Sequence, residues 1–249
     1  MLKKRIVIAL TFLEGVLFRT KRFVPDYRYT KNFVDLWNAD EIILIDISKN
    51  DKYSEKFIQV VNFFIDNCNL PIAVGGGIFS EKKASKLFKL GVEKIIINSS
   101  TFYNPKLTYK LTEIYGSSSI IHSVDCKKVN NKDYFVFVDN GKKNIGFAPE
   151  EWVKKIQQFN VGEILVNNID NDGGLMGYDM KLIKRILKVS NLPIIVLGGA
   201  GNWNHICNAL KEKKISAACT QNIYHFTNQS LFSLKSFLFK NNIKVRIDD

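Results

Sequence analysis

The feature that most constrains this chain is a repeated alternation between short apolar runs and longer amphipathic segments. The apolar runs carry valine, isoleucine and leucine without polar alternation, which is typical of parallel strands covered on both faces. Repeated strand–helix units predict a parallel sheet. We expect eight strands, at residues 5–10, 42–46, 72–74, 94–97, 119–124, 163–166, 194–197 and 217–219. We expect helices at residues 53–67, 80–90, 105–115, 149–159, 179–189 and 202–213.

An internal repeat favours a closed arrangement of these units. The stretch from Leu70 to Gly77 resembles the stretch from Leu192 to Gly199, an offset of 122 positions. Two like halves of four units predict an α/β fold, a (β/α)₈ TIM barrel, in which the first strand lies opposite the fifth. Such a barrel uses about 250 residues as one domain, so we assign residues 1–249 to a single domain. A doubly wound open sheet is the alternative.

Composition narrows the function classes. No apolar run is long enough for a transmembrane helix, and Glu14 and Gly15 interrupt the apolar start too early for a signal peptide, so we expect a cytoplasmic protein. The four cysteines are isolated, which predicts reduced thiols. The net charge is +12, but the lysines are scattered along predicted helices, which favours a solvated surface over a nucleic-acid interface. An anionic substrate needs only a local patch of this charge.

Glycine-rich turns are the strongest local signals. Gly75–Gly77 follows the third strand, and Gly198–Gly201 follows the seventh. Glycine lets backbone N–H groups approach an anion, and phosphate sites of this fold form at the carboxyl ends of strands. Two such turns at symmetric positions predict a substrate with a phosphate at each end, although tight packing without a ligand is the alternative. Polar donors beside the turns are Asn98, Ser99 and Asn222.

Ionisable residues at the strand ends are candidates for acid–base chemistry. Asp125 closes the fifth strand and is a candidate general acid or base. The alternative is a carboxylate that caps a loop or pairs with Lys127 or Lys128. Asp46 has a weaker claim, and strand parity points His122 away from Asp125.

Other polar residues point to a loop and to no metal site. His205 and His225 are expected on a helix or loop, without partners that would make a metal site, and we expect no cofactor. Residues 168–179 form an Asp/Asn/Gly-rich segment, which predicts a substrate loop, since its spacing does not suit calcium.

Four charged residues stand at or just before the starts of strands. They are Arg5, Glu41, Lys94 and Glu163. Two positive and two negative side chains there could form a ring inside the bottom of the barrel. From these residues alone, unrelated surface charges are the favoured interpretation.

Taken together, motifs along nearly the whole chain resemble the cyclase subunit of imidazole glycerol phosphate synthase. They lie at residues 1–6, 73–78, 124–128, 141–144, 162–165, 171–173, 177–179, 197–201 and 245–246. The resemblance implies a (β/α)₈ barrel without a cofactor, paired with a glutaminase subunit that docks at the N-terminal face. Ammonia would pass through the barrel to its mouth and attack a bis-phosphorylated ribonucleotide, giving imidazole glycerol phosphate and an aminoimidazole carboxamide ribotide.

The resemblance also implies roles for single residues. Arg5, Glu41, Lys94 and Glu163 match the charged gate of the ammonia channel, and Glu93 matches a position near the subunit contact. Asp125 matches the second of two catalytic aspartates, and Arg19 matches a phosphate-binding lysine in a mobile loop. Substrate or phosphate binding is implied for Gly76, Gly77, Asn98, Ser99, Asp172, Gly173, Gly198, Gly199 and Asn222.

The departures from the family lie at the mouth. The first catalytic aspartate falls on Thr11, whose hydroxyl cannot act as a carboxylate base. Asn167, Asn168, Leu197 and Asn222 replace small or hydroxyl residues, so the first phosphate site is intact and the second is altered.

Three hypotheses follow from this pattern. The first is a specialised paralogue that delivers ammonia, with a sugar amidotransferase as possible partner, for acetamidino-sugar synthesis in surface polysaccharides. The second is an orthodox histidine-pathway cyclase that tolerates Thr11. The third is a non-catalytic scaffold that activates the glutaminase.

Overall fold

Eight parallel strands close into a barrel. The computed structural model describes residues 3–28, 39–48, 54–130, 132–221 and 231–246. Neighbouring strands follow the order β10-β11-β12-β1-β4-β5-β6-β7, and β7 pairs with β10 to complete the circle. The predicted barrel is therefore confirmed, and the open sheet is wrong. The strands are β1 (Arg5–Leu13), β4 (Glu41–Asp46), β5 (Ile72–Gly75), β6 (Lys94–Ile97), β7 (Ile120–Val129), β10 (Glu163–Asn168), β11 (Ile194–Leu197) and β12 (Ile215–Thr220).

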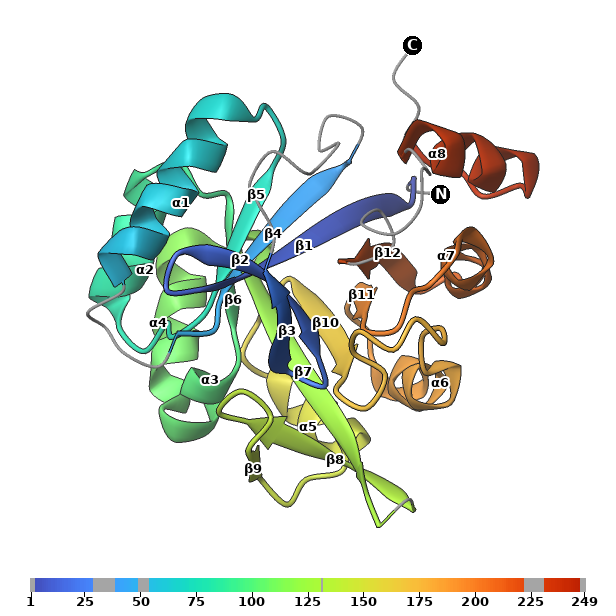
Figure 1. Cartoon of the computed structure of the whole chain (residues 1–249). Helices are drawn as coiled ribbons and strands as arrows, with labels where there is room; N and C mark the ends of the chain where they lie inside the picture. Colours follow the sequence, from blue (N-terminus) through green and yellow to red (C-terminus); the bar gives the residue numbers. More distant parts are fainter. Residues whose placement is uncertain (1–2, 29–38, 49–53, 131, 222–230, 247–249) are drawn as a thin grey trace.

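Helices surround the barrel (Figure 1). All six predicted helical segments are confirmed, with small shifts at their ends. Ser80 caps α2 by accepting a hydrogen bond from the Lys83 N–H, and Asp179 caps α6 in the same way from Leu182. Sequence reasoning missed α3 and α8. The helices are α1 (Ser54–Asn67), α2 (Glu81–Lys89), α3 (Ser99–Tyr103), α4 (Pro105–Tyr115), α5 (Pro149–Gln157), α6 (Met180–Val189), α7 (Trp203–Leu210) and α8 (Leu231–Lys240).

Two antiparallel hairpins extend opposite barrel strands. Strand β1 continues into β2 (Val16–Lys21) and β3 (Val24–Arg28), whereas β7 continues into β8 (Asp133–Val138) and β9 (Lys143–Asn144). Since β1 and β7 lie four strands apart in the circle, the hairpins preserve the symmetry of the two halves. The expectation that Arg19 lies in a loop is wrong: it lies on β2, because the segment pairs along β1 and β3.

The strands are buried on both faces, which explains their lack of polar alternation. Side chains on the outer face pack against the helices, whereas those on the inner face fill the barrel. His122 follows the predicted parity, since its ring is 1% exposed and lies 6.1 Å from the Trp152 ring of α5, outside the barrel. Burial lowers the pKa of His122 to about 3, so this side chain is neutral at physiological pH.

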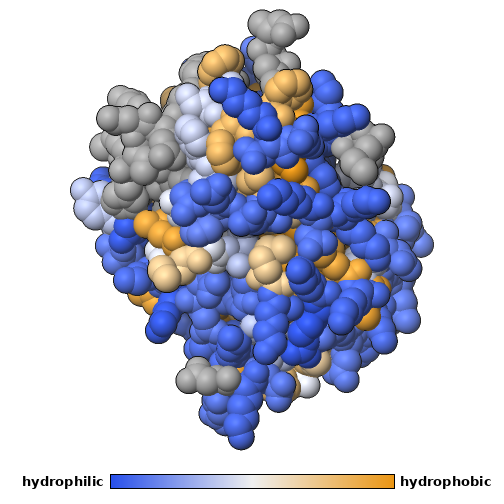
Figure 2. Space-filling view, turned by 90° about the vertical axis from the view of Figure 1, so that its right-hand side faces the viewer, coloured by the Kyte–Doolittle hydropathy of each residue, from blue (hydrophilic) through white to orange (hydrophobic). Residues whose placement is uncertain are grey.

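The outer surface is largely polar. Figure 2 shows the side that carries α6, α7 and α8, where hydrophilic side chains predominate and apolar ones form small separate groups. The four cysteines are buried free thiols. Within the described ranges, no helix has the length and hydropathy needed to cross a bilayer.

Candidate functional site

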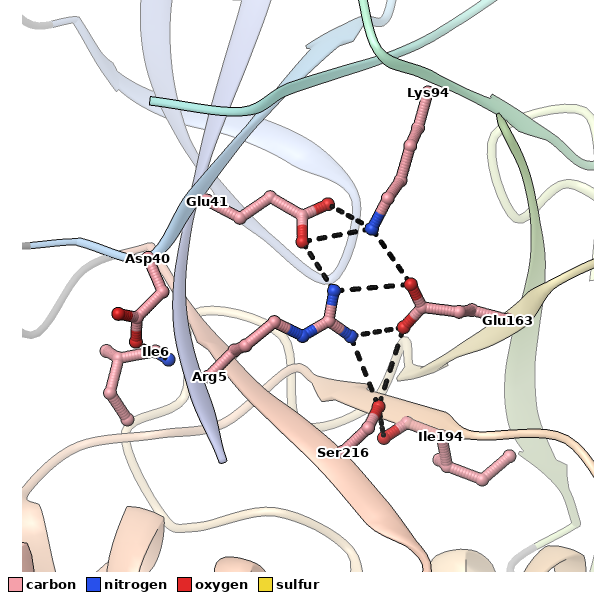
Figure 3. A network of polar contacts seen from close by, with 8 residues as sticks. All are labelled: Arg5, Ile6, Asp40, Glu41, Lys94, Glu163, Ile194 and Ser216. Carbon is pink, nitrogen blue, oxygen red and sulfur yellow. Dashed lines mark hydrogen bonds and ion pairs between the residues drawn. The ribbon is translucent and has the colours of Figure 1, made fainter. Parts of the chain in front are cut away.

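The four charged residues at the strand starts meet inside one end of the barrel (Figure 3). The Arg5 guanidinium donates to Glu41 at 2.6 Å and to both carboxylate oxygens of Glu163. The Lys94 ammonium donates to Glu41 at 3.3 Å and to Glu163 at 2.9 Å. Each cation thus bridges both carboxylates, and the four form a closed ring. The interpretation as unrelated surface charges is wrong.

The side chains of the charged ring are largely withdrawn from solvent. Glu41 is 2% exposed, and burial raises its pKa against the attraction of Arg5 and Lys94. The pKa of Glu163 lies below its usual range. Burial acts to raise this pKa, but the hydrogen bond and charge of Arg5, together with Lys94, have the larger effect. Removing one cation would leave each carboxylate with a single compensating charge. Sequence reasoning missed Ser216, whose hydroxyl accepts from Arg5 at 3.3 Å and donates to the Ile194 carbonyl at 3.1 Å.

The barrel interior beyond the charged ring is apolar. Small side chains contribute to it, including Ala9, Ala73 and Ala217. The larger ones are Val7, Ile43, Ile96, Ile121, Leu165, Ile195 and Leu197, with Cys219. This stretch separates two polar ends, so a charged species would have to lose its hydration to pass from one end to the other.

A cavity of about 140 Å³ opens at the carboxyl ends of the strands. Thr11 from β1 and Asp125 from β7 both line it, as the symmetry predicts. The first glycine turn also contributes to the wall, with Gly75, Gly76 and Gly77. The carboxyl ends of barrel strands are where the active sites of this fold lie, so this mouth cavity is the candidate active site.

Asp125 is held by hydrogen bonds from two neighbouring side chains. Its carboxylate accepts hydrogen bonds from Ser123 Oγ at 2.8 Å and from Asn98 Nδ2 at 3.0 Å. Burial raises its pKa to about 7, with a further contribution from the charge of Asp172 and an opposing one from the Ser123 hydrogen bond. A carboxyl group that titrates near neutrality suits general acid–base chemistry.

Neither lysine near Asp125 forms an ion pair with it in the described part of the chain. Lys127 and Lys128 instead lie over the rings of Phe137 and Tyr134. The pairing alternative is therefore wrong. Asp46 also lines the cavity, but its carboxylate accepts a hydrogen bond from the Ser48 N–H at 2.9 Å, close to its own strand end.

Thr11 is engaged by a residue that sequence reasoning missed. Its hydroxyl accepts a hydrogen bond from Gln221 Nε2 at 2.9 Å. The same amide nitrogen donates to the Phe18 carbonyl at 3.2 Å, and Gln221 Oε1 accepts from Thr20 at 3.3 Å. A neutral hydrogen-bonded network thus stands opposite Asp125. The position of Gln221 two residues after Cys219, at the end of the last strand, was the available signal.

The first glycine turn depends on the absence of a side chain. Gly76 has φ +111°, and a Cβ there would stand 2.1 Å from the Asp46 carbonyl oxygen. The second turn is similarly tight: Gly199 has φ +107°, and a Cβ there would stand 2.2 Å from the Gly177 carbonyl oxygen. Both turns therefore pack tightly against a neighbouring carbonyl, which explains part of the glycine requirement, and the first turn also lines the mouth cavity.

Substituting Gly76 should be costly for stability. Gly76→Ala places a side chain on a residue with positive φ and puts its Cβ against the Asp46 carbonyl. Gly146→Ala is the matched control, since Gly146 has φ +78° and nothing within 4 Å of its Cβ position. We expect the control to lose about 1 kcal/mol of unfolding free energy and Gly76→Ala to lose about 1–3 kcal/mol more, measured by urea denaturation. Equal losses of unfolding free energy in Gly76→Ala and Gly146→Ala would contradict the tight packing of Gly76 against the Asp46 carbonyl.

The other predicted binding residues are partly committed to protein contacts. The Asn98 amide donates to Asp125, and Ser99 Oγ donates to Asn98 and accepts from the Asp139 N–H. The Arg19 guanidinium pairs with Asp26 of β3 and does not line the mouth cavity.

The loop after β10 docks on the first hairpin. The Asp172 carboxylate accepts from the Phe23 N–H at 3.0 Å, and a Cβ on Gly173 would stand 2.3 Å from the Thr20 carbonyl oxygen. Gly198 and Gly199 line a separate small space of about 10 Å³. Asn222 and His225 lie outside the described residues. In the described part of the chain, no three His, Cys, Asp or Glu side chains are grouped to hold a metal ion.

Comparison with known proteins assigns the chain to a family. The family model described as "Histidine biosynthesis protein" matches residues 5–230. The chain belongs to this family. A relative from Hydrogenobaculum sp. (strain Y04AAS1) is 34% identical over 252 residues, which cover 99% of this chain and 100% of the relative. Relatives from Natranaerobius thermophilus and Dictyoglomus turgidum are 33% and 34% identical over comparable lengths. All three are named imidazole glycerol phosphate synthase subunit HisF.

Proposed function

We propose that this member of the histidine biosynthesis family is the synthase subunit of a glutamine amidotransferase complex. A glutaminase subunit docks at the N-terminal face of the barrel and releases ammonia there. The ammonia passes the charged ring of Arg5, Glu41, Lys94 and Glu163, crosses the apolar interior, and reaches a phosphorylated substrate at the mouth. The relatives' names support an enzyme of more than one subunit, since they describe each relative as a subunit of a synthase.

The observation that carries this proposal is the closed charged ring at the entrance to an apolar barrel. One buried and three partly buried charges are costly to maintain unless they are paired, and here every one is paired with both opposite partners. Beyond the charged ring, ammonium would lose its hydration, whereas neutral ammonia pays a smaller penalty. The arrangement therefore favours passage of a small neutral molecule.

The acceptor is proposed to differ from that of the histidine pathway. Thr11 offers no carboxylate, and its hydroxyl is held by Gln221. General acid–base catalysis contributes about 10²–10⁴-fold, so a mouth with one carboxylate of a catalytic pair suits a different reaction. We propose that the chain is a paralogue that delivers ammonia for acetamidino-sugar synthesis, together with a sugar amidotransferase.

One observation supports a second candidate, the orthodox histidine-pathway cyclase. The Asp125 side chain lines the mouth cavity, and its pKa lies near neutrality. If this group alone sustained the reaction, the chain would convert the bis-phosphorylated ribonucleotide to imidazole glycerol phosphate and aminoimidazole carboxamide ribotide.

The two candidates are separated by ammonia-dependent consumption of that ribonucleotide. Excess ammonium salt makes the glutaminase unnecessary, and product is followed by absorbance. We expect no substantial turnover by the wild-type chain and a measurable gain in Thr11→Asp, because the substitution supplies the missing carboxylate. Thr11→Asn is the matched control, with similar size and no base. Substantial wild-type turnover would overturn the paralogue proposal in favour of the cyclase.

A further inference from the structure

A separate buried ion pair joins the C-terminal helix to the barrel wall. The Lys235 ammonium of α8 donates to Asp40 at 3.0 Å, and the two side chains are 4% and 2% exposed. Among the ion pairs of the described ranges, it alone has both side chains buried. Taking two charges out of water is costly, and apolar side chains of similar volume would fill the same space. Stability alone is therefore a weak reason for this pair.

Asp40 holds the starts of β1 and β4 together. Its Oδ2 atom accepts a hydrogen bond from the Ile6 N–H at 2.7 Å, and its own N–H donates to the Ile6 carbonyl at 2.9 Å. The parallel ladder between the two strands begins one residue later, where Val7 stands beside Glu41. The Asp40 carboxylate therefore extends the contact between β1 and β4 to the first residues of both strands.

The same two strand starts carry members of the charged ring. Arg5 directly precedes Ile6, and Glu41 directly follows Asp40 (Figure 3). Side chains alternate between the faces of a strand, so Arg5 and Glu41 face the barrel interior while Ile6 packs in the outer core. The Arg5 guanidinium reaches Glu41 across these two strands, at 2.6 Å. Its position therefore depends on how firmly the start of β1 is held against β4.

We infer that Lys235 is a positioning residue of the charged ring: it neutralises Asp40, which holds β1 against β4 and thereby keeps Arg5 in contact with Glu41. The inference rests on the proposed function and extends it, because it makes passage through the charged ring depend on the C-terminal helix. Figure 1 shows α8 beside the start of β1. Without Lys235, Asp40 would be a buried carboxylate without its counter-charge, a costly state that draws it toward solvent and away from the Ile6 N–H.

The first test needs no glutaminase and follows the Arg5 guanidinium by NMR of ¹⁵N-labelled arginine side chains. Arg5 donates to Glu41 and to Glu163, so its Nη–H signals should be resolved in the wild-type chain. Lys235→Met keeps the length of the side chain and removes its charge. In this variant we expect the Arg5 signals to broaden or merge and the Ile6 amide to exchange about tenfold faster. Lys235→Arg keeps the charge and should retain the signals. Unchanged Arg5 signals in a folded Lys235→Met chain would overturn the inference.

Two double variants keep the test valid if Lys235→Met alone does not fold. Asp40→Asn and Asp40→Ala, each combined with Lys235→Met, both remove the buried pair of charges. Only asparagine still accepts from the Ile6 N–H, so we expect ordered Arg5 signals with asparagine and disordered ones with alanine. Equal Arg5 signals in the two double variants would overturn the role of Asp40. Arg185→Met is the matched control, because it removes from α6 a cation that pairs with Glu150, and it should leave the Arg5 signals unchanged.

The second test measures coupling in the complex with the glutaminase. Product formed per glutamine hydrolysed should fall several-fold in Lys235→Met and recover when Asp40→Asn is added, while turnover with added ammonium salt is unchanged. A purely structural role would not produce this recovery. Full coupling in a Lys235→Met complex would overturn only this inference. Arg5 signals that respond to Lys235→Met, in a wild-type complex that transfers no ammonia, would overturn the proposed function and leave the positioning of Arg5 supported.

Discussion

Asp125→Asn, introduced into the Thr11→Asp chain, should lower ammonia-dependent consumption of the bis-phosphorylated ribonucleotide by about 10²–10⁴-fold and leave substrate affinity nearly unchanged. Asparagine keeps the size of the side chain but neither accepts nor releases a proton. The rate of the Thr11→Asp chain should follow an ionisation near pH 7, because burial raises the pKa of Asp125 to about 7. This ionisation should be absent from the pH–rate profile of the residual activity in the variant.

The same group should make folding stability depend on pH. The unfolded Asp125 releases its proton near pH 4, whereas the folded one holds it to about pH 7. Between these pH values the folded state binds more protons than the unfolded state. The contribution of Asp125 to folding stability is therefore complete below pH 4 and is lost as the pH rises through 7. Urea denaturation at pH 5 and pH 8 measures this effect. The unfolding free energy should decrease from pH 5 to pH 8 by more in the wild type than in Asp125→Asn.

Asp46→Asn is the matched control, because Asp46 lines the same cavity and has its own backbone partner. We expect a much smaller loss of turnover in this variant. A greater loss in Asp46→Asn than in Asp125→Asn would transfer the acid–base role to Asp46. An unchanged rate in Asp125→Asn would leave Asp125 with a structural role only.

Lys94→Ala should uncouple glutamine hydrolysis from product formation. Lys94 bridges Glu41 and Glu163, and without it the charged ring opens on one side. Water then enters the barrel and ammonia escapes, so product per glutamine should fall several-fold while turnover with added ammonium salt is retained. Removing one partner of a buried pair costs about 3–5 kcal/mol. We expect a smaller loss of unfolding free energy, because Arg5 still contacts both carboxylates.

Lys86→Ala is the control for removal of a paired lysine. Its partner Glu55 is 73% exposed, so the pair lies in solvent and should contribute less than about 1 kcal/mol. Coupling should be unchanged in this variant. If Lys94→Ala retained full coupling in a folded complex, the charged ring would not act as a gate.

The barrel could be predicted from the sequence because its signals are local. Strands buried on both faces read as continuous apolar runs, and the repeat from Leu70 to Gly77 at Leu192 to Gly199 marks the two halves. Asp125 was recognisable as a strand-end carboxylate. The first hairpin was missed, because β2 and β3 are stabilised by pairing with β1 and with each other rather than by a strong pattern of their own.

The sequence by itself determined the fold class and the glycine turns, since both depend on residue type and spacing along the chain, and its resemblance to the family identified the missing carboxylate at Thr11. Only the tertiary structure decided which side chains meet. Arg5 contacts Glu163 and Gln221 contacts Thr11 because barrel closure brings the first strand beside the last and sets all strand ends around one axis. The electrostatics follow from that closure, because the pKa of Asp125 depends on burial by residues that lie far away in the chain.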